Sequence, residues 1–101
     1  MLLLDDELRN RLPPLYAQQS AKDPWIHAKY FLPGTAWEWL VMEGSPQDRD
    51  FLFFGFVVGL ESELGYFLLS ELEQVRAGGV FRVERDLHFR EGKLTDVVSA
   101  P

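Results

Sequence analysis

The most apolar run in the chain covers residues 51–58, FLFFGFVV, and contains no polar side chain. Its aromatic and β-branched residues favour a strand that is covered on both faces over a helix. Gly59 and Gly65 enclose the segment LESEL, and glycine readily takes the backbone angles that a tight reversal needs. We therefore expect residues 51–58 to form the central strand of a sheet, joined by a hairpin to a return strand at residues 66–69.

Capping signals predict two short helices. The segment SELE places Glu73 three residues after Ser70, which is the spacing of a capping box, so we expect Ser70 to be a helix N-cap. The glycine pair at residues 78–79 predicts the end of that helix. Near the start of the chain, Asp5 is a suitable N-cap for another helix, which we expect to end near Leu12.

Alternation of apolar and polar residues predicts three more strands, at residues 25–32, 37–42 and 83–89. Residues 44–50 are polar and indicate an exposed loop, and residues 92–101 are expected to form a frayed tail. These elements predict one α+β domain over residues 1–101, with a core at about residues 4–91. It consists of a mostly antiparallel sheet of about four or five strands, a short N-terminal helix, and a second short helix packed on the sheet.

Composition narrows the possible functions. The 101 residues include no Cys, which excludes disulfides, thiolate zinc sites and cysteine nucleophiles and favours a reducing compartment. Sixteen acidic against ten basic residues give a formal charge of −6, so nucleic acid is not an expected partner. Neither a signal peptide nor a membrane-spanning run is evident, and the glycines fit no phosphate-binding loop. We expect a cytoplasmic protein with no cofactor and no membrane partner.

Four residues are candidates for protein binding. Trp37 and Trp39 share one face of a predicted strand, which either packs into the core or forms an exposed recognition surface. Glu61 and Glu63 lie at the predicted hairpin tip, where polar residues are ordinarily solvated but a pair of carboxylates is suggestive of a function. We expect a small acidic accessory module that docks on another protein, and the apolar strand at residues 66–69 leaves a homodimer open.

Two alternatives rest on other acidic residues. In the first, Glu84, Asp86 and His88 alternate along a predicted strand and, with Glu61 and Glu63, would form the metal site of an enzyme. Alternate strand residues are about 7 Å apart and metal bonds about 2 Å long, so one ion could use at most two of the three. The hairpin carboxylates would have to complete the site. In the second alternative the protein is an acidic mimic that blocks a DNA-binding protein, which requires rows of negative charge on one face.

Five motifs along the chain are candidate family signatures: LPPLY at residues 12–16, WxW at 37–39, FGxVxGLExELGYF at 54–67, SELE at 70–73 and ERDLxF at 84–89. Together they resemble a known bacterial family of unknown function that is often carried on plasmids and other mobile elements. The resemblance covers nearly the whole chain. It implies a small stand-alone cytoplasmic protein associated with mobile DNA, and it implies no activity and no site residues.

Overall fold

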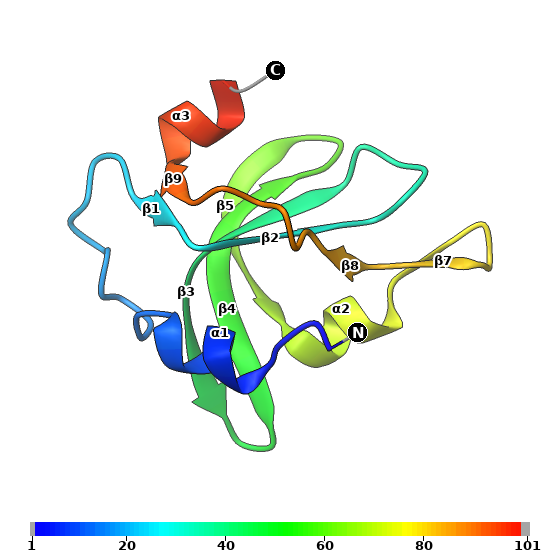
Figure 1. The fold of residues 1–101 in the computed structure, drawn as a ribbon, viewed down its shortest axis with the longest axis horizontal. Coiled ribbons are helices and arrows are strands. Elements are labelled where there is room, and N and C mark those ends of the chain that lie inside the picture. The colour runs from blue at the N-terminus through cyan, green and yellow to red at the C-terminus, as the bar shows by residue number, and fades with distance from the viewer. Residues whose placement is uncertain (1, 100–101) are drawn as a thin grey trace.

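The computed structural model describes residues 2–99 (Figure 1). Within that range the main body is an antiparallel five-stranded sheet with the order β5-β4-β3-β2-β8. Its strands are β2 (Ala28–Phe31), β3 (Glu38–Gln47), β4 (Asp50–Val58), β5 (Ser62–Leu68) and β8 (Glu84–Arg85). Two small ribbons accompany it: β1 (Trp25–Ile26) pairs with β9 (Gly92–Lys93), and β6 (Arg76–Ala77) pairs with β7 (Phe81–Arg82). The expected α+β class and the antiparallel sheet are confirmed.

Strand β4 lies between β3 and β5, as its apolar sequence predicts. Phe51 and Phe53 are buried on one face, while Phe54 and Phe56 point to the other. Gly55 pairs with Val41 of β3, next to the register shift of the β3–β4 ladder. A Cβ atom at this position would lie 2.0 Å from the carbonyl oxygen of Leu40. Glycine is therefore required here by close packing of neighbouring strands.

Helices α1 (Asp6–Arg11) and α2 (Leu69–Gln74) cover the same face of the sheet (Figure 1), where both contribute leucines to the main hydrophobic cluster. Asp5 caps α1 as expected, accepting the Leu8 N–H at 2.8 Å. The prediction that Ser70 caps α2 is wrong, because α2 begins at Leu69 and its N-cap is Leu68. The side chain of Glu71, and not that of Glu73, accepts the Leu68 N–H at 2.9 Å. Among the helices of residues 2–99, none has both the length and the apolar content to cross a membrane.

The other face of the sheet carries a smaller hydrophobic cluster, to which helix α3 (Leu94–Ser99) adds Leu94 and Val97. The expected frayed tail is therefore wrong for residues 92–99. This segment is ordered because β9 pairs with β1 and because Asp23 accepts hydrogen bonds from the backbone and the hydroxyl of Thr95, at 3.0 and 2.6 Å. Figure 1 shows α3 beside β9 and β1, at the end of the chain. Residues 100–101 lie outside the described range.

Three local predictions need correction. Most of the expected loop at residues 44–50 is strand, because the lack of a side chain at Gly44 lets the Phe51 ring pack across β3. The glycines at residues 78–79 do not end a helix but form the turn between β6 and β7, with positive φ values of 58° and 72°. The expected strand at residues 83–89 is reduced to β8, and Leu87, which follows β8, is 64% exposed.

A buried carboxylate holds the LPPLY segment against the sheet. The pairing of β3 with β4 shifts register after Val41, which indicates a bulge, and Glu43 beyond it is only 2% exposed. Its two carboxylate oxygens accept the backbone N–H groups of Tyr16 and Gln18, at 2.8 and 2.6 Å. Backbone donors of an irregular segment thus satisfy a charge that would otherwise be costly to bury.

Candidate protein-interaction surface

The two candidate tryptophans differ in exposure although they share a strand face. Trp39 is buried, at 7% exposure, whereas Trp37, which immediately precedes β3, is 38% exposed. The rings stack with centroids 6.0 Å apart, and the Trp37 ring lies over Gly59 at the start of the β4–β5 loop. Trp39 is therefore a core residue, and Trp37 is the one that contributes to the surface beside the hairpin tip.

Glu61 and Glu63 are both exposed at the β4–β5 hairpin, with Glu61 in the loop and Glu63 near the start of β5. Leu60 precedes Glu61 in the same loop and is 96% exposed. An almost fully solvated leucine at the tip of a hairpin is a feature of recognition surfaces more than of folding, because it contributes little to the core. Sequence reasoning identified the carboxylates and missed Leu60.

Strand β5 adds exposed apolar residues along the edge of the sheet, on the face opposite to that of the two tryptophans. Leu64 and Tyr66 are 52% and 53% exposed, and the Tyr66 ring packs on Phe54 with centroids 4.7 Å apart. A hydrogen bond to the side chain of Tyr16 raises the pKa of Tyr66, which places a second exposed aromatic beside it. The available sequence signal was the alternation of faces within β5. Phe67 is buried in the main core, so Leu64 and Tyr66, which share the opposite face of the strand, point away from that core.

All charged residues of the unit formed by β4, β5 and α2 are acidic. Residues 50–74 contain five Asp and Glu and no Lys, Arg or His. Asp50 has a structural role, since it accepts the Ser70 hydroxyl and the N–H groups of Phe51 and Ser70, and the bond from the Ser70 hydroxyl is the main cause of its lowered pKa. The other four are Glu61, Glu63, Glu71 and Glu73, and none of them makes an ion pair within residues 2–99. This part of the surface therefore has an uncompensated negative charge.

The carboxylates proposed for a metal site do not converge. Strand β8 ends at Arg85, so Glu84, Asp86 and His88 do not alternate on one strand. Asp86 instead accepts the backbone N–H of His88, at 2.9 Å. In the part of the chain that the structure describes, no three His, Asp or Glu side chains are grouped so that they could hold a metal ion. The metal-site geometry expected for these three residues with Glu61 and Glu63 is therefore wrong.

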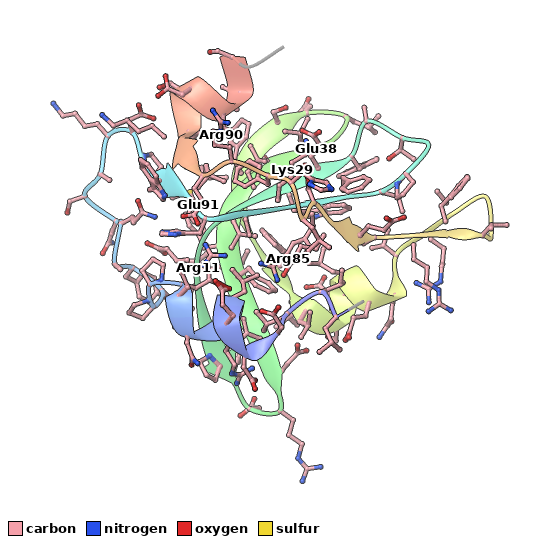
Figure 2. The ribbon with its side chains drawn as sticks, in the orientation of Figure 1. Arg11, Lys29, Glu38, Arg85, Arg90 and Glu91 are labelled. Carbon is pink, nitrogen blue, oxygen red and sulfur yellow. The ribbon has the colours of Figure 1, made fainter. Side chains whose placement is uncertain are left out.

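A cavity of about 850 Å³ lies between the second face of the sheet and residues 86–98. Its sheet side is apolar, with Leu40, Phe56 and Val58, and it also contains the ion pair of Lys29 and Glu38, at 2.9 Å. Figure 2 shows these two charged residues on β2 and β3, with Arg90 beside the C-terminal segment. Charges of both signs line the cavity, so it has no clear preference for an anionic or a cationic ligand.

Glu91 fastens the C-terminal segment to the rest of the domain (Figure 2). Its carboxylate pairs with Arg11 of α1 and accepts the Trp25 indole N–H at 3.0 Å. It also lies 3.2 Å from Nδ1 of His27, whose pKa is lowered by burial although Glu91 acts in the opposite direction. These contacts of Glu91 with Arg11, Trp25 and His27 attach the C-terminal segment to the N-terminal part of the domain. This structural role accounts for the grouping of the four side chains without a catalytic role.

Comparison with known proteins supports the expected family. Residues 3–99 match a family model described as "Protein of unknown function (DUF2958)". Searches of curated proteins and of solved structures found no match. Because the matched segment covers nearly the whole sequence, the chain belongs to this family of unknown function.

Proposed function

We propose that this protein is a small binding module that docks on another protein through the β4–β5 hairpin and strand β5. The main support is the number of exposed apolar side chains on this one unit, with Leu60 in the hairpin loop and Leu64 and Tyr66 on β5, while the exposed Trp37 ring contacts Gly59 at the start of that loop. Large apolar and aromatic residues that are solvated in the free protein are frequent anchors of protein interfaces. The hairpin belongs to the central sheet, so its side chains are presented with little conformational freedom to lose on binding.

The proposal includes a cytoplasmic location, which the absence of cysteine favours. An association with mobile genetic elements rests only on the resemblance of the motifs and stays a prediction. The acidic-mimic alternative has less support. The glutamates lie at the two ends of β5, which are roughly 20 Å apart for a strand of this length, with apolar residues between them. A continuous row of charge, as a mimic of DNA phosphates requires, is not formed along β5.

A matched pair of leucines tests the proposal. Leu60 and Leu87 are both well exposed, but Leu87 follows β8 at the opposite edge of the sheet. We expect Leu60→Asp to abolish co-purification of a stoichiometric partner from cells of the source organism, and Leu87→Asp to retain it. Native mass spectrometry reports the partner and its stoichiometry, and thermal melts confirm that both variants fold. Equal retention of the partner by both variants would refute docking through the hairpin.

A further inference from the structure

Strand β5 is an open edge of the sheet. Within residues 2–99 its backbone pairs only with β4, over seven residues from Ser62 to Leu68. The opposite edge, β8, is two residues long and contains two charged residues. Short or charged strands protect an edge from further pairing, whereas a longer apolar strand without Pro or Lys is able to accept another strand. Building on the proposed function, we infer that the partner contributes an extended, Lys- or Arg-bearing segment that pairs with β5 as a sixth strand.

Two hydrogen bonds indicate which backbone groups of β5 point outward. Leu68 donates its N–H to the Glu71 side chain at 2.9 Å, so this N–H is directed away from β4. At the other end, the N–H of Gly59 bonds to the carbonyl of Glu61 across the hairpin. Successive residues of a strand direct their N–H groups to opposite sides. Both bonds therefore place the N–H and C=O groups of Leu64 and Tyr66 on the open side, where an added strand would bond to them.

The side chains along β5 specify what the added strand carries. On one face, residues opposite Leu64 and Tyr66 meet exposed apolar surface, which favours apolar side chains. On the other face, Glu63 favours a basic residue opposite it. Between them, Gly65 has no atom within 4 Å of where its Cβ would be, so a bulky side chain of the partner has room there. The matching segment has apolar residues opposite the middle of β5 and basic residues toward its two ends, where the glutamates of the hairpin and of α2 lie.

Charge selects a basic partner over a second copy of this chain. Antiparallel pairing of two β5 strands about Gly65 places Glu61 and Glu63 of each copy along a joint edge that contains no basic residue. Four glutamates from each copy, those of the hairpin and of α2, would share that region, and like charges oppose such pairing. Lys and Arg in the added strand instead neutralise the same glutamates.

The probe for a test is the nine-residue peptide Lys-Thr-Val-Ile-Thr-Val-Lys-Thr-Lys, whose residues oppose positions 69 to 61 in antiparallel pairing. A control peptide has Glu in place of the three Lys. We expect titration with the lysine peptide to shift the backbone amide NMR signals of Leu64 and Tyr66 and to slow their hydrogen exchange. The glutamate peptide should leave them unchanged. Shifts confined to residues away from β5, or no shifts with the lysine peptide, would overturn the inference.

Two sets of variants separate backbone pairing from charge. Leu64→Pro removes one outward N–H and should abolish peptide binding, while Leu64→Ala keeps that N–H and should bind more weakly but measurably. The double variant Glu61→Gln with Glu63→Gln leaves the backbone intact and should weaken binding about fivefold at low salt, because two exposed ion pairs are lost. If Leu60→Asp releases the cellular partner but Leu64→Pro retains it, docking stands and strand addition fails. If Leu60→Asp also retains the partner, the docking proposal itself fails.

Discussion

The register partners Gly55 and Gly65 should respond oppositely to the same substitution. Gly55 in β4 pairs with Gly65 in β5. An alanine Cβ at Gly55 would lie 2.0 Å from the carbonyl oxygen and 2.9 Å from the carbonyl carbon of Leu40, both of them backbone atoms of β3. At Gly65 the same Cβ meets nothing within 4 Å. Neither glycine has a positive φ angle, so backbone strain does not enter the comparison.

The magnitude follows from the contact distances. To restore an ordinary 3.4 Å contact, β3 and β4 must separate by about 1.4 Å beside Gly55, which breaks the adjoining ladder hydrogen bonds. Overpacking costs about 1–3 kcal/mol and each lost hydrogen bond about 1 kcal/mol, so we expect Gly55→Ala to lower the free energy of unfolding by about 3–4 kcal/mol. Gly65→Ala should raise it by about 0.4–1 kcal/mol, because alanine restricts the unfolded chain.

Urea unfolding followed by tryptophan fluorescence measures both effects, since Trp39 is buried in the main core. In thermal melts, Gly55→Ala should lower Tm by more than 10 °C, given about 4–8 °C per kcal/mol for a domain of this size. A Gly55→Ala protein within about 1 kcal/mol of the parent would refute the close approach of β3 and β4. A strongly destabilised Gly65→Ala protein would refute the open space beside β5, on which the proposed strand addition also relies.

Three further predictions concern groups away from β5. Glu43→Gln should lower the free energy of unfolding in urea by about 1.5–3 kcal/mol, because an amide NH₂ replaces one of the two oxygens that accept the N–H groups of Tyr16 and Gln18. An unchanged unfolding midpoint would contradict this role of Glu43. Burial lowers the pKa of His27 below its usual 6.5, so the unfolded chain binds the proton more readily and stability falls as pH drops through and below 6.5. His27→Gln should show a shallower loss of Tm over that pH range, and parallel curves would argue against it. Leu94→Ala should speed amide exchange in residues 92–99 while leaving β4 protected, and uniform acceleration would mean that α3 does not open by itself.

Much of the fold could be predicted from sequence because its signals are local. The apolar run at residues 51–58 predicts a central strand through side-chain alternation and composition, and Asp5 predicts the start of α1 through a hydrogen bond to a residue three positions away. The hairpin after residue 58 follows from the glycines on either side of its tip. In each case the interacting groups are near neighbours in the chain, so the pattern of residues determines the structure with little help from the rest of the domain.

The capping of α2 shows where local signals fail. Ser70 and Glu73 have the spacing of a capping box, yet Ser70 bonds to Asp50, which lies twenty residues earlier at the start of β4. Residues 92–99 are similarly ordered by partners near residues 23–26, which no local pattern identifies. In both places a contact between distant segments competes with a local preference, and the tertiary contact wins because it is made within a packed surface.

For the candidate surface, sequence and tertiary structure determined different properties. The sequence alone determines its charge, because residues 50–74 contain acidic and no basic side chains in any fold. Only the tertiary structure decided that this segment forms an edge of the sheet, that Trp37 is exposed while Trp39 is buried, and that Leu60 projects into solvent. The physical reason is that exposure depends on which strands lie next to one another, and strand order arises from contacts among segments far apart in the chain.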